Sequence, residues 1–137
     1  KGTLKAVGTK NGKRITSEKT TTEKPFAIVL SPHKTQLKAG KQDAVVVNVS
    51  VVDKKGREVP NADALIQFQL TGDARIIGVG NGDPSSHEKD TFAEGERVER
   101  KLFNGKCQVI IRSGEKGGKV QLRATSNGLK EAVVRMN

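Results

Sequence analysis

The 137-residue sequence contains neither tryptophan nor tyrosine, and only four phenylalanines represent the large aromatic side chains. Sites for sugars or for single-stranded nucleic acid commonly stack flat rings against exposed aromatic side chains. At least two of the four phenylalanines occupy positions that the strand pattern assigns to the core. A carbohydrate-binding module of the aromatic-platform type is therefore disfavoured, and so is a stacking platform for nucleic acid.

Cysteine is also scarce, since Cys107 is the single thiol of the chain. One cysteine cannot form an intrachain disulfide or supply a multi-cysteine zinc site. In the segment KCQVIIR, Cys107, Val109 and Ile111 alternate and so share one face of a strand. We therefore expect Cys107 to be a small buried hydrophobic residue rather than a reactive nucleophile.

Long hydrophobic runs are missing as well, and none reaches the roughly 18 residues of a membrane-spanning helix. We therefore predict no membrane insertion. The chain starts at Lys1 without an initiator methionine or a signal peptide, so we expect it to be a piece of a longer polypeptide. Its length suits one domain whose core needs no disulfides.

Acidic residues are too few to balance the charge, because 25 Lys and Arg face 15 Asp and Glu, which gives a net charge of +10. Residues 1–41 hold ten basic and two acidic side chains, whereas residues 42–137 hold fifteen and thirteen. A basic region of this kind suits an anionic partner or an acidic neighbouring domain, or is simply solvated. The nearly balanced body and the missing aromatic platforms lead us to predict no nucleic-acid partner.

Apolar residues recur at every second position almost throughout the chain, and no segment has the periodicity of an amphipathic helix. Turn signals rich in Gly, Asn and Asp separate the alternating runs at roughly 8 to 12 residues. This pattern predicts an all-β fold, namely an immunoglobulin-like β-sandwich of about seven to nine antiparallel strands in residues 25–137. The inward positions are expected to include Phe26, Ile28, Leu30, Val45, Val47, Val49, Val51, Ile66, Phe68 and Leu70.

Residues 1–24 precede this sandwich and have a pattern of their own. Asn11-Gly12 lies between two alternating runs, which is a strong signal for a β-hairpin. An isolated hairpin is only marginally stable in water. We therefore expect residues 1–24 either to pack on the sandwich or to be the tail of a preceding domain, with a boundary near residues 21–25.

The segment GVGNGDPSSHE, residues 78–88, is the most unusual stretch. Its glycines are spaced by two and no helix pattern follows, unlike a phosphate-binding loop. It lacks the acidic alternation of a calcium loop, and consecutive Ser, His and Glu residues point in different directions and so form no triad. We predict a polar connection without catalytic residues, metal or cofactor, anchored on the sandwich by Phe92. The candidates for a ligand or interdomain contact are Asn81, Asp83, His87 and Glu88.

The densest acidic cluster follows in the segment EGERVER, which contains Glu94, Glu96 and Glu99. Glycoside hydrolysis needs two carboxyl groups that face each other at a defined separation. Alternating Glu and Arg residues are more simply explained by an exposed strand with cross-paired charges. We therefore predict no glycosidase carboxylate pair here.

Two long segments carry a family resemblance, GVGNGDPSSHE and LFNGKCQVIIRSGEKGGKVQLRATSNGL. They resemble the C-terminal immunoglobulin-like domain of glycoside hydrolase family 2 enzymes, the large β-galactosidase-like proteins of Bacteroidetes. The loop Asn81-Gly82-Asp83-Pro84 and the turn Phe103-Asn104-Gly105 are the most specific parts. Residues 2–25 resemble the last strands of the accessory domain that precedes it in those enzymes.

The resemblance implies a parent enzyme that hydrolyses terminal β-linked sugars with two glutamates on a (β/α)8 barrel. Such a barrel needs ~250 residues, so we expect no enzymatic activity from this chain. It would be a non-catalytic accessory domain that packs against other domains of the parent polypeptide, with the substrate cleft or an oligomer contact as further places to act. The carbohydrate would be met only through the parent, whose implied location is periplasmic or secreted. The alternative is an immunoglobulin-like spacer module of a bacterial surface adhesin.

Overall fold

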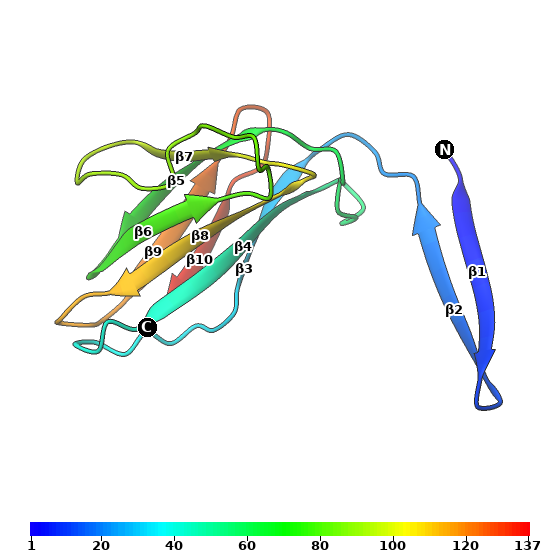
Figure 1. Ribbon diagram of the computed structural model, residues 1–137, viewed down its shortest axis with the longest axis horizontal. Helices are drawn as coiled ribbons and strands as arrows, with labels where there is room; N and C mark the ends of the chain where they lie inside the picture. Colours follow the sequence, from blue (N-terminus) through cyan, green and yellow to red (C-terminus); the bar gives the residue numbers. More distant parts are fainter.

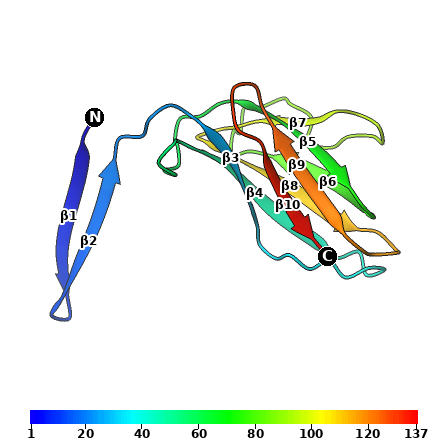
Figure 2. The same cartoon turned by 180° about the vertical axis from the view of Figure 1, so that it is seen from behind.

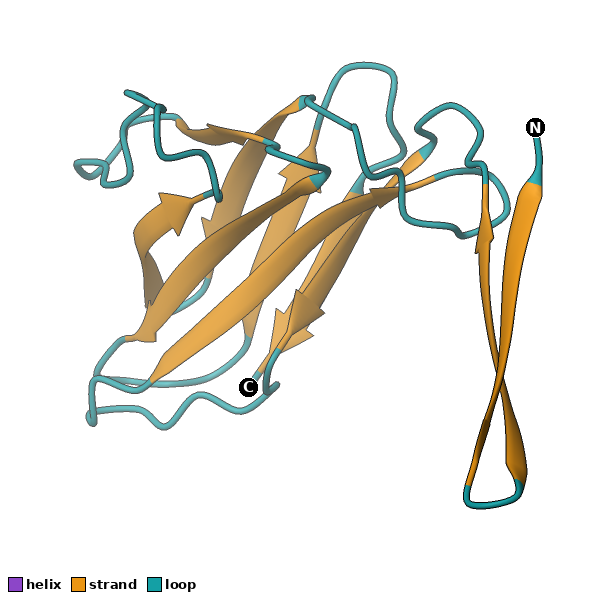
Figure 3. Ribbon diagram, turned by 45° about the vertical axis from the view of Figure 1, so that its right-hand side comes forward, coloured by secondary structure: helices purple, strands orange, loops and turns teal.

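The computed structural model describes all residues from 1 to 137 as ten β-strands joined by turns and loops (Figures 1 and 3). Eight strands form two four-stranded antiparallel sheets that pack face to face, and the first two strands form a separate hairpin. The prediction of an immunoglobulin-like β-sandwich is therefore confirmed, with a strand number inside the expected range. No helix in the chain has the length and apolar character that crossing a membrane requires.

The two sheets are each assembled from strands that are distant in the sequence. The first sheet has the spatial order β3 (Ala27–Pro32), β4 (Ala44–Val52), β8 (Lys106–Ser113), β6 (Ala74–Gly80). The second has the order β10 (Ala132–Met136), β9 (Val120–Thr125), β5 (Leu65–Thr71), β7 (Val98–Lys101). β4 and β8 are the central strands of the first sheet, so each is paired along both edges with a neighbouring strand.

The core lies between the two sheets and takes its side chains from alternate positions of the central strands. A slip of one residue would turn these side chains to solvent, so the alternation fixes the register. Burying each side chain of this size stabilises the fold by about 1.5–3 kcal/mol. The inward positions predicted on β4 and β8 are confirmed, with exposures of 0–2%, and they are Val45, Val47, Val49, Val51, Cys107, Val109 and Ile111.

Cys107 is a core residue, as the alternation of its strand predicts. Burial raises the pKa of the Cys107 thiol to about 12, so the thiol stays protonated at neutral pH. Because the thiolate is the reactive species, this cysteine is chemically inert in the folded chain.

Phe26 corrects one of the predicted core positions. Its side chain is 40% exposed, and the Lys54 ammonium lies 5.7 Å from the centre of its ring. The reason is that β3 begins only at Ala27, so Phe26 lies at the end of the sandwich, where its amide donates to Val52 and its carbonyl accepts from Lys130. Phe92, by contrast, packs against the core and anchors its loop as expected.

Main-chain hydrogen bonds close one lateral edge of the sandwich, between β3 and β10. The Ile28 amide donates to the Lys130 carbonyl at 3.0 Å, and the Leu37 amide donates to the Asn137 carbonyl at 2.7 Å. At the opposite edge the segment between β6 and β7 folds over the sheets, and the Val79 amide donates to the Asp90 carbonyl at 2.9 Å (Figure 1).

Arg100 lies beneath that second edge and is only 6% exposed. It pairs with the buried Ile66 on β5, so its side chain points between the sheets. The guanidinium donates to the carbonyls of Glu88 and Lys89 at 3.3 and 3.4 Å, while its Nε has no hydrogen-bond partner. Arg100 therefore holds the segment between β6 and β7 in place from the inner side of the sheet.

The prediction of an exposed, charge-paired strand in EGERVER is wrong. The strand β7 begins only at Val98, and Glu96 instead accepts a hydrogen bond from the Ala93 amide in the preceding turn at 2.8 Å. Arg100 faces inward because it has the same parity as the half-buried Val98 and the buried Leu102. The alternation of side chains along the strand turns the Arg100 side chain inward, although its charge favours contact with solvent.

The strands β1 (Thr3–Lys10) and β2 (Lys13–Thr20) form the predicted hairpin, which projects away from the sandwich (Figures 1 and 2). Asn11 and Gly12 have φ values of 50° and 74°, the left-handed pair that a tight two-residue turn requires. Every residue of both strands is exposed. The division into units at residues 24 and 25 stays a prediction.

Asp53 connects the segment that follows β2 to the sandwich. Its side chain is fully buried, and Oδ2 accepts from the Glu23 amide at 3.0 Å. The amides of Lys55 and Arg57 donate to Oδ1, and Arg57 Nε donates to Oδ2 at 2.9 Å. Burial opposes ionisation of Asp53, but these hydrogen bonds outweigh it and lower the pKa well below its ordinary value of 3.8. The ionised carboxylate thus joins the segment after β2 to the turn after β4.

We expect Asp53→Asn to lower the unfolding temperature by several degrees at neutral pH, because one amide oxygen cannot accept all four donors. A lowered folded-state pKa stabilises the fold above the unfolded-state pKa, and this contribution is lost as pH falls through the folded-state pKa. The difference between the native chain and the variant should therefore shrink below about pH 4. Circular dichroism melts between about pH 2 and 7 measure it, with Asp63→Asn, an exposed position, as the control. A difference that does not change with pH would contradict this role.

We expect Arg100→Met and Arg100→Lys to cost about 1–3 kcal/mol each, because methionine cannot donate a hydrogen bond and the lysine ammonium lacks the planar fork that reaches the separate loop oxygens. The loss should be greatest in the segment between β6 and β7, where hydrogen exchange of the Val79 amide reports whether the segment stays in place. Glu99→Gln on the same strand is the matched control. Unchanged exchange at Val79 in both Arg100 variants would show that Arg100 does not hold this segment.

Candidate functional site

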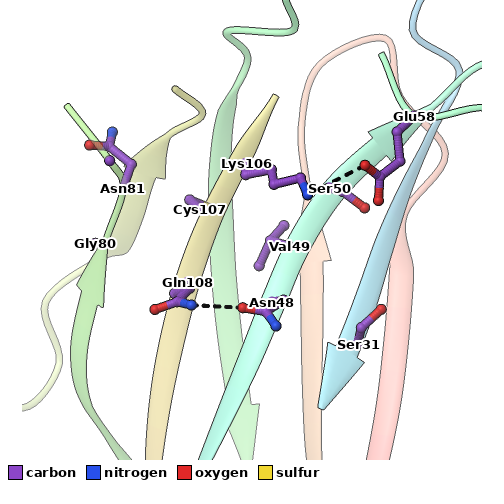
Figure 4. Close-up of a pocket in the computed structure, with 11 residues that line it drawn as sticks. Ser31, Asn48, Val49, Ser50, Glu58, Gly80, Asn81, Lys106, Cys107 and Gln108 are labelled. Carbon is purple, nitrogen blue, oxygen red and sulfur yellow. Dashed lines mark hydrogen bonds and ion pairs between the residues drawn. The ribbon is translucent and has the colours of Figure 1, made fainter. Parts of the chain in front are cut away.

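A groove of about 570 Å³ lies on the outer face of the sheet formed by β3, β4, β8 and β6 (Figure 4). Strand alternation creates this face, because residues between the core positions of β4 and β8 point outward. Only two of its eleven lining residues are hydrophobic. The lining consists of Ser31, Asn48, Val49, Ser50, Glu58, Gly80, Asn81, Gly82, Lys106, Cys107 and Gln108.

Two side-chain amides occupy the middle of the groove. Asn48 on β4 lies directly across from Gln108 on β8, and Gln108 Nε2 donates to Asn48 Oδ1 at 2.8 Å (Figure 4). Both residues are exposed. Because the bond between them uses one donor and one acceptor, the pair still presents the Nδ2 donor of Asn48 and the Oε1 acceptor of Gln108.

A charged pair lies at one end of the groove. Lys106 Nζ is 3.5 Å from Glu58 Oε2, and the two side chains are 67% and 59% exposed. An ion pair this exposed adds little to stability. The pair instead contributes opposite charges that cancel within the groove.

Gly80 keeps the groove open along β6. It pairs with Gln108, so a side chain at this position would point to the outer face. A Cβ built on Gly80 would have no heavy atom within 4 Å, and the residue does not have a positive φ. The glycine is therefore not required by backbone strain, and its effect is to leave space beside the amides.

Asn81 and Glu88, two of the predicted contact residues, are brought together around β7. Asn81 Nδ2 donates to the Lys101 carbonyl at 2.8 Å, and its Oδ1 accepts from Arg100 at 3.3 Å. Glu88 Oε1 accepts from the Lys101 amide at 3.1 Å, and its Oε2 lies 3.7 Å from Arg100 Nε. Their polar groups thus shape the loop, and only Asn81 also lines the groove.

Asp83 and His87, the other two predicted contact residues, lie farther along the same loop. Hydrogen bonds from the Ser85 hydroxyl and amide lower the pKa of Asp83, which closes the turn. His87 is exposed and takes part in no hydrogen bond. A role of these residues in binding a ligand or another domain stays a prediction. Nowhere in the chain are three or more His, Cys, Asp or Glu side chains grouped to hold a metal ion.

The groups in the groove can bind but are not arranged for nucleophilic catalysis. Ser31 and Ser50 have no hydrogen bond to a base, and the Cys107 thiol stays protonated. The nitrogen Nδ1 of His33, outside the groove, accepts from the Val46 amide at 2.9 Å and extends the strand pairing instead. The groove therefore offers hydrogen-bonding groups but no activated nucleophile.

Asn48 and Gln108 were not among the residues chosen from the sequence. A signal was present, because both are amides at outward positions that alternate with buried apolar residues. The sequence does not say which strands are neighbours, however. Asn48 and Gln108 are 60 positions apart in the sequence, and only the pairing of β4 with β8 brings their side chains into contact.

Comparison with known proteins gives consistent results. The family model of the glycoside hydrolase family 2 C-terminal domain 5 matches residues 28–135. The β-galactosidase BoGH2A of Bacteroides ovatus is 39% identical over 137 residues, which cover 99% of this chain and 16% of that protein. A family 2 structure from Bacteroides cellulosilyticus matches 99% of this chain at 31% identity with a TM-score of 0.90. A β-glycosidase structure from Bacteroides vulgatus matches 98% at 30% identity with a TM-score of 0.85.

The chain spans less than a fifth of each of these proteins, namely 16%, 18% and 17% of their lengths. It has the all-β fold of a single sandwich with a hairpin, and the catalytic barrel of such enzymes lies elsewhere in their chains. The family match covers most of the sequence, including every strand of the sandwich in whole or in part. The chain belongs to the C-terminal domain 5 family of glycoside hydrolase family 2.

Proposed function

We propose that the chain is a non-catalytic accessory domain of a β-galactosidase-type glycosidase and that it serves interdomain packing through its hairpin. The observation that carries this proposal is the exposure of the hairpin, in which no residue of β1 or β2 is buried. A two-stranded hairpin of this kind is marginal in water. It gains stability when another surface covers it.

The apolar residues of the hairpin are grouped mainly on one face. Leu4 and Ala6 on β1 have the same parity as Gly8, which pairs with Ile15 on β2. Leu4 is 75% exposed and Ile15 is 52% exposed. Covering these side chains contributes roughly 25 cal/mol per Å² of apolar surface removed from water. This face is therefore the surface that another domain of the parent polypeptide would cover.

The charges of the hairpin add a requirement for the covering surface. Residues 1–20 carry six basic side chains and a single acidic one, Glu18. Three of the basic residues, Lys10, Lys13 and Arg14, lie at or beside the turn at the tip. A neighbouring domain with an apolar centre and an acidic rim would complement this surface.

The match to a solved structure extends over the hairpin as well as the sandwich, and this supports the proposal. The Bacteroides cellulosilyticus structure matches 99% of the chain with a TM-score of 0.90, so the likeness extends over the hairpin as well as the sandwich. The spacer module of an adhesin is the weaker alternative, because the family match is to a glycosidase domain. Export to the periplasm or beyond stays a prediction from the resemblance.

We expect the double substitution Leu4→Ser with Ile15→Ser to lower the unfolding temperature of the full-length parent by several degrees. In the isolated 137-residue chain the same change should leave the melting of the sandwich unaltered, because the hairpin is not part of its core. Differential scanning calorimetry of both lengths measures the two effects. Val133→Ser, at a position 37% exposed on β10, is the control outside the hairpin.

The full-length parent and the 137-residue chain also test whether this domain is non-catalytic. The full-length parent should hydrolyse a nitrophenyl β-galactoside, whereas the 137-residue chain should not. Hydrolysis by the 137-residue chain would overturn the non-catalytic role. Equal sensitivity of both lengths to the hairpin substitutions would overturn the packing role.

A further inference from the structure

We propose that the groove over β4 and β8, with the Asn48–Gln108 amide pair at its centre, binds a neutral saccharide (Figure 4). This site is separate from the hairpin surface and from the predicted contact residues of the loop, apart from Asn81. It departs from the expectation that the chain meets carbohydrate only through its parent. It rests on four properties of the groove: its polarity, its hydrogen-bonding groups, its balanced charge and its size.

The polarity of the groove distinguishes a small hydrophilic ligand from a covering protein domain. Lys and Glu are depleted in protein interfaces relative to the rest of the surface, whereas Lys106 and Glu58 are both part of this lining. The other outward side chains of the lining are amides and hydroxyls (Figure 4). A second protein surface would have to desolvate all of these groups, which is unfavourable without a partner for each.

The hydrogen-bonding groups match those of a polyol. Each sugar hydroxyl can both donate and accept, like the hydroxyls of Ser31 and Ser50. Asn48 Nδ2 is a free donor and Gln108 Oε1 a free acceptor, and they lie at the two outer ends of the bonded pair (Figure 4). Hydroxyls on different parts of one saccharide can therefore bond to the two ends of the amide pair.

The balanced charge selects a neutral ligand. The only charged residues of the lining are Lys106 and Glu58, which lie 3.5 Å apart and carry opposite charges. An anionic sugar acid would be attracted by one and repelled by the other. The basic excess of the chain lies instead toward its N-terminal part.

The size and shape of the groove fit one or two sugar units. Its volume of about 570 Å³ lies within the range of roughly 300–1,000 Å³ for small-molecule sites. Gly80 keeps the side next to Gln108 free of any side chain. No aromatic ring lines the groove, so stacking does not contribute and we expect binding in the millimolar range.

The test is a titration of the isotope-labelled 137-residue chain with lactose, followed by nuclear magnetic resonance. We expect saturable shifts of the side-chain amide signals of Asn48 and Gln108 and of the neighbouring backbone signals on β4 and β8. The double substitution Asn48→Ala with Gln108→Ala should weaken binding by about tenfold or more, which corresponds to losing about 1.4 kcal/mol. Gln69→Ala, an exposed amide on β5 of the other sheet, should leave binding unchanged.

Gly80→Val separates binding from folding. The new side chain meets no heavy atom through its Cβ, and valine favours strands, so the unfolding temperature should not fall. The same side chain should fill the space beside Gln108 and abolish the lactose-induced shifts. Glucuronate, a sugar of similar size with a negative charge, should cause weaker shifts than lactose.

Three results would overturn the proposal. The first is that the signals of Asn48 and Gln108 do not shift with lactose at up to ~50 mM, a concentration well above the expected millimolar dissociation constant. The shifts could persist in both the Gly80→Val and the double-substituted chain, which would place the binding elsewhere. Glucuronate could bind as tightly as lactose, which would refute selection by charge. None of these results bears on the hairpin, whose test uses the full-length parent.

Discussion

The antiparallel pairing of β4 with β8 is the interaction on which both the core and the groove depend. The pair Val47 and Val109 faces the second sheet, and the next pair along the same ladder, Asn48 and Gln108, faces outward. A β-strand has no third direction for its side chains, so the register that buries the valines also aligns the amides. The same register therefore sets both the packing of the core and the alignment of the amide pair.

Two buried charges, Asp53 and Arg100, hold the hairpin and the segment between β6 and β7 in place at the edges of the sandwich. Asp53 receives hydrogen bonds from four donors and holds the segment through which the hairpin leaves the sandwich. Arg100 lies between the sheets and donates to the carbonyls of the segment between β6 and β7. A buried charge is costly unless it is satisfied, so each is stable only when its segment is in place. The positions of the hairpin and of the loop are therefore coupled to the core without being part of it.

The two exposed surfaces of the molecule differ in the kind of partner that they suit. The hairpin presents Leu4 and Ile15 between basic residues and gains from being covered by another domain. The groove presents amides, hydroxyls and one balanced ion pair, which a second protein surface would satisfy poorly. The two proposals are compatible, because the hairpin would be covered within a longer polypeptide while the groove would remain open to solvent.

The sequence by itself determined the strands, their inward faces and the turns, because these depend on local properties. Alternating valines predict β4, and Asn11-Gly12 predicts the hairpin turn, since few residues adopt left-handed conformations readily. Local reasoning went wrong at Phe26, where the start of the strand decides exposure, and at Arg100, where charge suggested solvent but parity places the side chain inside. Only the tertiary structure decided that Asn48 meets Gln108 and that Asp53 holds the Glu23 amide. These contacts join residues 60 and 30 positions apart, and the choice of neighbouring strands comes from the joint packing of both sheets rather than from any local pattern.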